Sequence, residues 1–176
     1  MPVIEIAQLP VNRGADGVGY PAPFDKGCDL FESVSLGDAV GLTQFGVNME
    51  KLLPGGMSSQ RHWHENEDEF VYVLVGEVVL VEDGTETVLK EGSAAGWKAG
   101  APTAHHLINR TDQPAFLLIV GTRAKTEKVH FPDIDLAYER DADGASRYLH
   151  RDGTPYPVEE VEEQDMETLE LPNAED

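Results

Sequence analysis

The sequence predicts an all-β domain, built as a sandwich or a barrel. At least seven short segments have strand character, and Gly, Pro or Asp turns separate them at close spacing. No stretch among them has the period of a convincing amphipathic helix. The chain of 176 residues and 19.3 kDa suits one compact domain with a modest tail.

The first forty residues precede this pattern. Residues 1–40 contain three turn-rich clusters, PVNRG, YPAPFDKG and SLGD, with short apolar stretches between them. Because Pro and Gly interrupt regular structure, we expect an irregular arm that packs on the domain rather than a helix. The barrel itself is expected over residues 41–123.

Strand signals follow one another from residue 41 onward. In the first segment, Phe45, Val47 and Met49 alternate with polar or small residues, which is the period of a half-buried strand. The pair Asp83-Gly84 is a strong hairpin signal between two later segments. The expected strands lie within residues 43–50, 70–74, 78–81, 87–89, 94–97, 105–108 and 115–120.

Beyond Arg123 the chain becomes polar. It contains the turn-rich strings FPDIDL, DADG and RDGTPYP, so we expect an irregular extension over residues 124–156. Residues 157–176 hold nine acidic side chains and no Lys or Arg. Such a segment has too little apolar surface to bury, so we expect a disordered acidic tail.

The composition excludes several classes of partner. The net charge of -20 leaves no basic footprint for nucleic acid or for an anionic membrane surface. No run approaches 18 consecutive apolar residues, so no spanning helix is predicted. The N-terminus has neither a basic start nor a continuous apolar region, and we therefore expect a cytoplasmic protein. Cys28 is the single cysteine, which excludes an internal disulfide.

Three histidines and one carboxylate fall at or beside expected strands. His62 and His64 are separated by one residue, which places both rings on one face of a strand. Glu69 enters an apolar run, where a carboxylate is costly to bury unless a cation or a donor meets it. His105 begins a later strand. Together these residues suit a divalent transition metal with positions left open for water or substrate.

The other polar residues near these segments have ordinary explanations. Glu65, Glu67 and Asp68 are expected to be solvated acids in a loop that joins two strands. His130 and His150 are expected at the surface of the polar C-terminal part. No general base stands out, so the sequence assigns no catalytic residue.

The spacing of these residues resembles the cupin superfamily. The first motif of that family, G(X)5HXH(X)3,4E(X)6G, is matched at every position by Gly56, His62, His64, Glu69 and Gly76. The second motif, G(X)5PXG(X)2H(X)3N, is matched by Gly92, Gly100, His105 and Asn109. The resemblance covers residues 41–121, so the arm and the tail lie outside it.

The second motif departs from the family pattern in two places. Lys98 stands where proline is usual, and four residues instead of two separate Gly100 from His105. A slip of one residue exchanges the two faces of a strand, so the adjacent His106 is an alternative ligand. We prefer His105, because its spacing to Asn109 fits the family pattern.

The resemblance implies a double-stranded β-helix, the cupin or jelly-roll barrel. It also implies one divalent transition metal per chain near the mouth of the barrel, held by His62, His64, Glu69 and His105. The family uses Mn, Fe, Ni, Zn, Co or Cu, and this ligand chemistry does not choose among them. More narrowly, the chain looks like a group of uncharacterised single-domain bacterial cupins, some of them loosely labelled sugar-phosphate-isomerase-like. The exposed strand edges of small cupins imply a homodimer.

These observations lead to the hypothesis of a metal-dependent enzyme that acts on a small polar organic molecule. It would be an isomerase, epimerase or lyase, with a base that removes a C–H proton. Alternatively it would be a dioxygenase that uses Fe(II). The acidic body disfavours a phosphorylated substrate through long-range repulsion. A different class of function is a non-catalytic module that binds or senses a small molecule at the metal.

Overall fold

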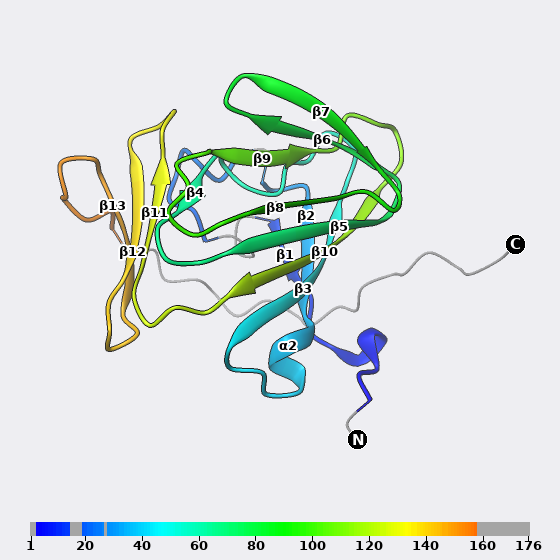
Figure 1. The fold of residues 1–176 in the computed structure, drawn as a ribbon, viewed down its shortest axis with the longest axis horizontal. Helices are drawn as coiled ribbons and strands as arrows, with labels where there is room; N and C mark the ends of the chain where they lie inside the picture. Colours follow the sequence, from blue (N-terminus) through cyan, green and yellow to red (C-terminus); the bar gives the residue numbers. More distant parts are fainter. Residues whose placement is uncertain (1–2, 15–18, 27, 158–176) are drawn as a thin grey trace, which may run out of the picture.

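The structure is a computed structural model that describes residues 3–14, 19–26 and 28–157. Figure 1 shows that strands make up almost all of its regular structure. The elements are η1 (Ile6–Gln8), β1 (Asn12–Arg13), β2 (Phe31–Ser35), α2 (Leu36–Ala39), β3 (Phe45–Leu52), β4 (Trp63–His64), β5 (Glu69–Val75), β6 (Glu77–Glu82), β7 (Thr85–Lys90), β8 (Ala94–Trp97), β9 (His105–Ile108), β10 (Ala115–Thr122), β11 (Glu127–Phe131), β12 (Leu136–Arg140) and β13 (Ser146–Leu149). Within the described ranges, no helix has the length and apolar character needed to cross a bilayer.

The seven strands expected between residues 41 and 123 are all present, as β3 and β5–β10. The hairpin between β6 and β7 turns at Asp83 and Gly84, whose φ angles are 42° and 83°. Two consecutive residues at positive φ fit a tight two-residue hairpin turn, which matches the right-handed twist of the strands. Local turn chemistry therefore sets the register of this pair.

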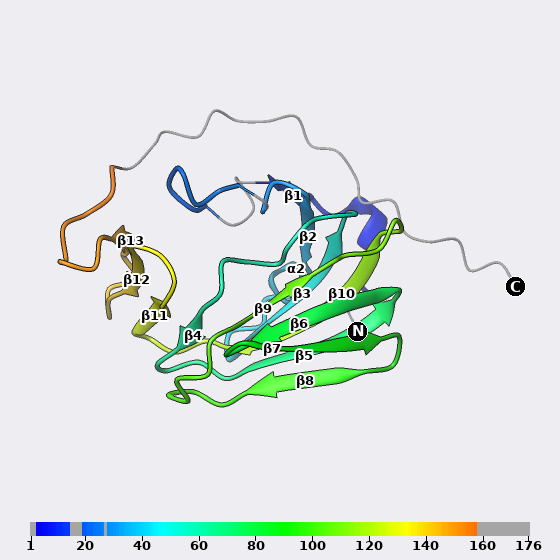
Figure 2. The ribbon, with the colours of Figure 1, turned by 90° about the horizontal axis from the view of Figure 1, so that it is seen from above.

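Two sheets face each other and enclose the main core. A six-stranded sheet has the order β1-β2-β3-β10-β5-β8, and a three-stranded sheet has the order β7-β6-β9. Figure 2 shows β6, β7 and β9 lying over β5, β8 and β10. The side chains buried between the two sheets include Leu52, Val71, Val73, Val78 and Leu117, each fully buried. This packing confirms the predicted all-β barrel.

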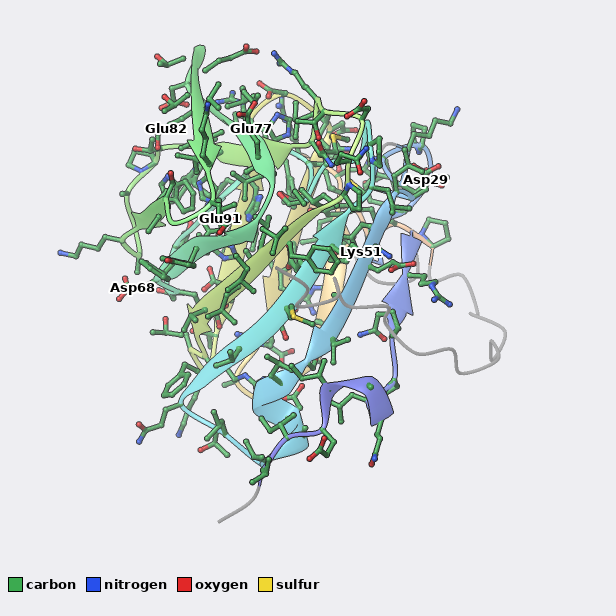
Figure 3. All side chains as sticks on the ribbon, turned by 90° about the vertical axis from the view of Figure 1, so that its right-hand side faces the viewer. Asp29, Lys51, Asp68, Glu77, Glu82 and Glu91 are labelled. Atoms are coloured by element: carbon green, nitrogen blue, oxygen red, sulfur yellow. The ribbon has the colours of Figure 1, made fainter. Side chains whose placement is uncertain are left out.

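The N-terminal arm adds the edge strands β1 and β2 to the six-stranded sheet and covers part of its outer face. Strand β2 pairs with β3, and Figure 3 shows β1, β2, β3 and β10 side by side. Val34 of β2 packs against Met49 of β3, and Ile6 and Leu9 of the arm complete this cluster. Met49, on the apolar side of β3, is therefore buried under the arm. Its polar side faces the interior of the barrel, where Asn48 lines a cavity.

The expectation of an irregular chain beyond residue 123 is wrong for residues 127–149. These residues form β11, β12 and β13, which join β4 in a four-stranded sheet with the order β13-β12-β11-β4. One face of this sheet buries Val129, Phe131 and Leu136. Tyr20 and Phe24 of the arm pack against these side chains. Because the arm supplies part of this core, the polar composition of the extension alone did not indicate it. The predicted acidic tail lies outside the described residues, apart from Pro157.

A buried amide joins the end of β9 to the end of β3. Asn109 is fully buried, and its Nδ2 donates to the carbonyl oxygens of Leu52 at 2.9 Å and Gln113 at 2.7 Å. Its Oδ1 accepts hydrogen bonds from the backbone N–H and the hydroxyl of Thr111, at 2.9 Å and 2.8 Å. All the hydrogen-bonding capacity of this side chain is therefore used inside the protein.

We expect Asn109→Ala to lower the free energy of unfolding by about 2–4 kcal/mol, because it leaves buried carbonyl and N–H groups unpaired. Urea unfolding followed by circular dichroism measures this change. The matched control is Asn66→Ala, which removes one exposed hydrogen bond to Thr126 and should change the stability by less than about 0.5 kcal/mol. Equal effects of the two substitutions would contradict the role given to Asn109.

Candidate metal centre

The four predicted ligands come from strands of three different sheets. His64 lies in β4 of the four-stranded sheet, Glu69 begins β5 of the six-stranded sheet, and His105 begins β9 of the three-stranded sheet. His62 precedes β4 and pairs with His105, each donating its backbone N–H to the carbonyl of the other at 3.1 Å and 2.9 Å. The site therefore lies where the three sheets meet.

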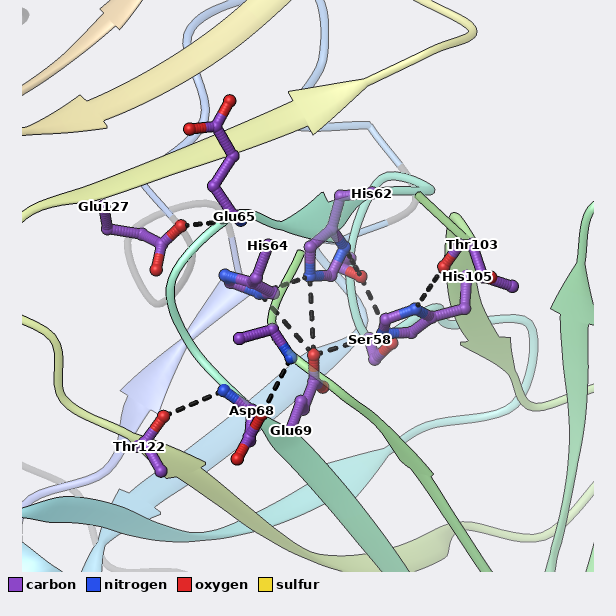
Figure 4. Close-up of polar contacts among 12 residues, drawn as sticks. Ser58, His62, His64, Glu65, Asp68, Glu69, Thr103, His105, Thr122 and Glu127 are labelled. Atoms are coloured by element: carbon purple, nitrogen blue, oxygen red, sulfur yellow. Dashed lines mark hydrogen bonds and ion pairs between the residues drawn. The ribbon is translucent and has the colours of Figure 1, made fainter. Parts of the chain in front are cut away.

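Four side-chain atoms converge at this point, as Figure 4 shows. The Nε2 atoms of His62 and His64 are 3.0 Å apart. Oε2 of Glu69 lies 3.1 Å from Nε2 of His105, 3.6 Å from that of His64 and 3.7 Å from that of His62. Bonds of about 2.1 Å to one ion would separate neighbouring donors by roughly 3.0 Å at right angles and roughly 3.4 Å at tetrahedral angles. The donors of His62, Glu69 and His105 lie within 4.8 Å of one another, which fits a single coordinated cation. His64 can join them through its contacts with His62 and Glu69, and its donor also lies within 4.8 Å of Glu67 and Glu127.

Contacts on the far side of two rings turn their Nε2 atoms inward. Nδ1 of His62 lies 2.9 Å from the carbonyl oxygen of Gln60, and Nδ1 of His105 lies 3.2 Å from that of Thr103. A carbonyl can only accept, so each Nδ1 carries a proton and leaves Nε2 with its lone pair. Trp97 stacks on His105 with the ring centroids 3.5 Å apart, which fixes the plane of that ring.

The hydrogen-bond arrangement around His105 fits a cation. Both ring nitrogens of His105 face oxygens that only accept hydrogen bonds, the carbonyl of Thr103 and the carboxylate of Glu69. A neutral imidazole has one N–H and cannot satisfy both. A second proton on His105 would satisfy the Thr103 carbonyl and the Glu69 carboxylate and nothing else. A metal ion can instead contact Glu69 together with the three imidazoles. The residues present therefore fit a divalent metal.

The protonation states of His62 and Glu69 also favour metal binding. Burial lowers the pKa of His62 to about 4, although the charge of Glu69 opposes the shift. Burial alone would raise the pKa of Glu69, but the hydrogen bond with His105 and the surrounding imidazoles hold it at about 2. At neutral pH the site therefore offers a neutral His62 and an ionised Glu69, which are the forms that bind metals.

His106 lies outside this cluster. Neighbouring residues of β9 point to opposite faces, and Nδ1 of His106 lies 3.2 Å from the carbonyl oxygen of Ser59. His130 and His150 also lie elsewhere, paired with Glu65 at 2.6 Å and with Asp135 at 2.8 Å. Of the two adjacent histidines, the structure brings His105 to the cluster.

A cavity of about 540 Å³ opens beside the four side chains. Strand β3 contributes Gly46, Asn48 and Glu50 to its wall, the arm contributes Tyr20, and β12 contributes Arg140. Two acids expected to be solvated, Glu67 and Asp68, also line it: Glu67 pairs with Arg140, and Asp68 accepts a hydrogen bond from the backbone of Ala99 at 2.7 Å. Segments outside the predicted motifs, from the arm, β3 and β12, therefore help to shape the cavity.

Two carboxylates near the cluster were missed by the sequence analysis. Glu127 of β11 is 3% exposed, and its Oε1 accepts backbone hydrogen bonds from Glu65 at 3.0 Å and Asn66 at 3.2 Å. It thus holds the loop that follows His64. Glu50 projects into the cavity, and burial, together with the charge of Glu69, raises its pKa to about 8. Both residues lie on strands that carry no part of the histidine motifs. The alternation of β3 placed Glu50 on its polar face, and the structure turns that face towards the cavity.

We expect the metal-free protein to lose stability on acidification. The unfolded chain binds a proton on His62 below about pH 6.5, whereas the folded protein does so only near pH 4, so falling pH favours unfolding across this window. The predicted loss attributable to His62 is up to about 3 kcal/mol. Glu69 adds a further loss between about pH 4.5 and pH 2. Urea unfolding of the metal-free protein at several pH values measures this. The His62→Ala variant should flatten the first window, and a wild-type curve that is already flat there would contradict the assignment.

Comparisons with known proteins agree with this fold. The cupin domain model matches residues 48–121, which include all four predicted ligands. A search of the curated proteins finds no match. Among solved structures, the chain is 40% identical to a protein from Silicibacter pomeroyi described as a sugar phosphate isomerase from a cupin superfamily. That alignment covers 89% of this chain and 98% of the other, with a TM-score of 0.82.

Two further structures share the fold at lower identity. A putative sugar phosphate isomerase from Acidithiobacillus ferrooxidans is 28% identical over 73% of this chain and 82% of its own, with a TM-score of 0.64. A polyketide cyclase from Streptomyces resistomycificus is 19% identical over 69% of this chain and 79% of its own, with a TM-score of 0.54, and so shows similarity of fold alone. With the fold, the histidine motifs and the match over almost the whole chain in agreement, this protein belongs to the cupin superfamily.

Proposed function

We propose that this cupin is a metal-dependent enzyme of the isomerase, epimerase or lyase type that acts on a small polar organic molecule. The observation that carries the proposal is the convergence of His62, His64, His105 and Glu69 on one point at the edge of a cavity. These residues would hold one divalent transition metal per chain. Its identity among Mn, Fe, Ni, Zn, Co and Cu is not fixed by three imidazoles and a carboxylate.

A metal held there would act as a Lewis acid that polarises a carbonyl or hydroxyl oxygen of the substrate. The cavity of about 540 Å³ lies within the range of small-molecule sites. Its wall is mixed in character, with polar side chains such as Asn48 and Ser58 beside apolar Leu107 and Ile119. This combination suits a compact molecule that carries several oxygens.

The similarity to proteins described as sugar phosphate isomerases supports an isomerase over a dioxygenase. The cavity itself favours an uncharged substrate over a phosphorylated one. The arginines that line it are Arg123 and Arg140, and in the described structure they pair with Asp38 and Glu67. A phosphate group would therefore have to compete with carboxylates for either arginine. We propose α-hydroxy aldehydes and ketones without phosphate as the substrate class.

The expected metal content is about one ion per chain in protein purified without chelator. His62→Ala and His105→Ala should each weaken binding by at least about 100-fold, because losing even an outer partner of a ligand costs about 10–100-fold. The matched control is His106→Ala, which removes the neighbouring ring on the opposite face of β9. Elemental analysis after dialysis gives the stoichiometry. Full occupancy in the His105 variant together with loss in the His106 variant would reverse the assignment.

The expected activity is metal-dependent isomerisation of an uncharged α-hydroxy carbonyl compound. Dihydroxyacetone, glyceraldehyde and xylulose are suitable probes, with dihydroxyacetone phosphate as the charged comparison. Product formation followed by proton NMR, with and without chelator, measures the activity. Oxygen uptake in place of isomerisation would indicate the dioxygenase alternative. Metal-dependent binding without turnover across the panel would indicate the non-catalytic binding module instead.

The homodimer, the cytoplasmic location and the small-molecule partner remain predictions. Sedimentation of the purified protein tests the first of these directly. The outer face of β5 presents Phe70 and Tyr72, which are 43% and 38% exposed. Exposed aromatic side chains of this kind are enriched at protein interfaces, and this face is our candidate for the dimer contact.

A further inference from the structure

Glu50 occupies an unusual position for an acidic residue. Strand β3 alternates, so that Met49 is buried under the arm and Lys51 pairs with Glu32 at 3.1 Å on the outer side. Glu50 and Asn48 point the other way and line the cavity that contains the four ligands. The carboxyl group therefore faces the space that a substrate would occupy.

This carboxyl group has no partner among the described residues. The other acids around the cavity are engaged: Glu67 pairs with Arg140, Asp68 accepts a hydrogen bond from Ala99, and Glu69 contacts the imidazoles. No hydrogen bond or ion pair within the described ranges involves the side chain of Glu50. A half-buried acid that faces a cavity without a partner is costly, which favours a function for it over a role in stability.

We propose that Glu50 is the proton-transfer residue of this cavity, whose carboxylate takes a proton from the carbon beside the carbonyl of a bound α-hydroxy carbonyl compound. This inference rests on the proposed function, and it adds the group that performs the chemistry. The same carboxyl group then returns the proton to the neighbouring carbon.

The step balances without an oxidant. The C–H bond breaks and its electron pair stays on the substrate as an enediolate, while an O–H bond forms on Glu50. In the second half the O–H bond on Glu50 breaks and the proton joins the adjacent carbon. The proton of the substrate hydroxyl passes to the neighbouring substrate oxygen, so that one oxygen becomes the new carbonyl and the other the new hydroxyl. The products are an isomerised substrate and an unchanged carboxylate, so neither oxygen nor a redox partner is required.

The surroundings of Glu50 raise the pKa of its carboxyl group, and a nearby cation would lower it again. Burial and the charge of Glu69 raise its pKa to about 8, so the carboxyl group is mostly protonated at neutral pH in the metal-free protein. A cation at the four ligands would offset the charge of Glu69 and lower this pKa towards neutrality, where a general base is most effective. The other titratable groups that line the cavity are Tyr20, His62, His64, Glu67, Asp68, His105, Arg123 and Arg140.

The first test uses the metal-free protein and does not depend on activity. An unfolded chain loses the proton of this side chain near pH 4.5, but the folded protein keeps it to about pH 8, so rising pH destabilises the wild type. Glu50→Gln removes this pH-dependent destabilisation, because the amide side chain does not titrate. Its urea midpoint should exceed that of the wild type by an amount that grows from pH 5 to pH 8. The control Glu91→Gln, at an exposed position outside the cavity, should show no such growth. A difference independent of pH would overturn the placement of Glu50.

The second test measures proton transfer directly. Metal-loaded protein is incubated with dihydroxyacetone in D2O, and NMR follows deuterium incorporation at carbon. Glu50→Gln should retain the wild-type metal content and lose at least about 100-fold of the exchange rate, with kcat falling more than KM changes. Glu50→Asp should recover part of the rate, because it keeps the carboxylate.

The outcomes separate the two proposals. Wild-type exchange in Glu50→Gln, at full metal content, overturns the role of Glu50 and leaves the metal site standing. Absence of metal from the wild type overturns the proposed function. Metal-loaded wild type that exchanges none of the three uncharged probes overturns the proton-transfer role, and oxygen uptake by the same sample would assign the site to oxidation instead.

Discussion

The site depends on one short backbone pairing, between His62 and His105. The two residues exchange both N–H···O bonds, and so the approach to β4 and the start of β9 lie side by side. Glu69 reaches the same point from β5, where its strand pairs with β8 and β10. The six-stranded sheet, which carries Glu69, therefore meets the four-stranded sheet that carries His64 and the three-stranded sheet that carries His105. Because the backbone is fixed by ladder hydrogen bonds, the four side chains are held close together before any ligand binds.

The barrel uses the two faces of β3 in the opposite sense from a typical half-solvated strand. On the apolar face Met49 lies under the N-terminal arm and packs on Val34, and the polar face lines the cavity. This inversion places Glu50 in the wall of the cavity. The C-terminal strands also contribute to the site. Glu127 of β11 accepts backbone hydrogen bonds from the loop after His64 and so fixes the position of that loop. The arm and the extension are therefore parts of the site as well as its covering.

Local signals in the sequence were sufficient for the barrel strands and for the residues that converge. Alternation and the Asp83-Gly84 turn located β3 and β5–β10, because both depend on neighbours within a few residues. They failed for β11–β13, whose buried face is completed by Tyr20 and Phe24 from the far end of the chain. A segment that shares its core with a distant segment has no complete pattern of its own. The same limit applies to Glu127 and Glu50, whose significance comes from what lies opposite them.

The sequence by itself determined the all-β class, the spacing of the histidine motifs and the cupin resemblance, since these are properties of residues close together in the chain. Only the tertiary structure decided that His105 rather than His106 faces Glu69, because a strand shows one of two faces to the interior and packing selects it. The tertiary structure also decided which acidic side chains line the cavity and which form ion pairs at the surface. The physical reason is that burial and charge act through space, and three sheets have to meet before either acts on the side chains of this site.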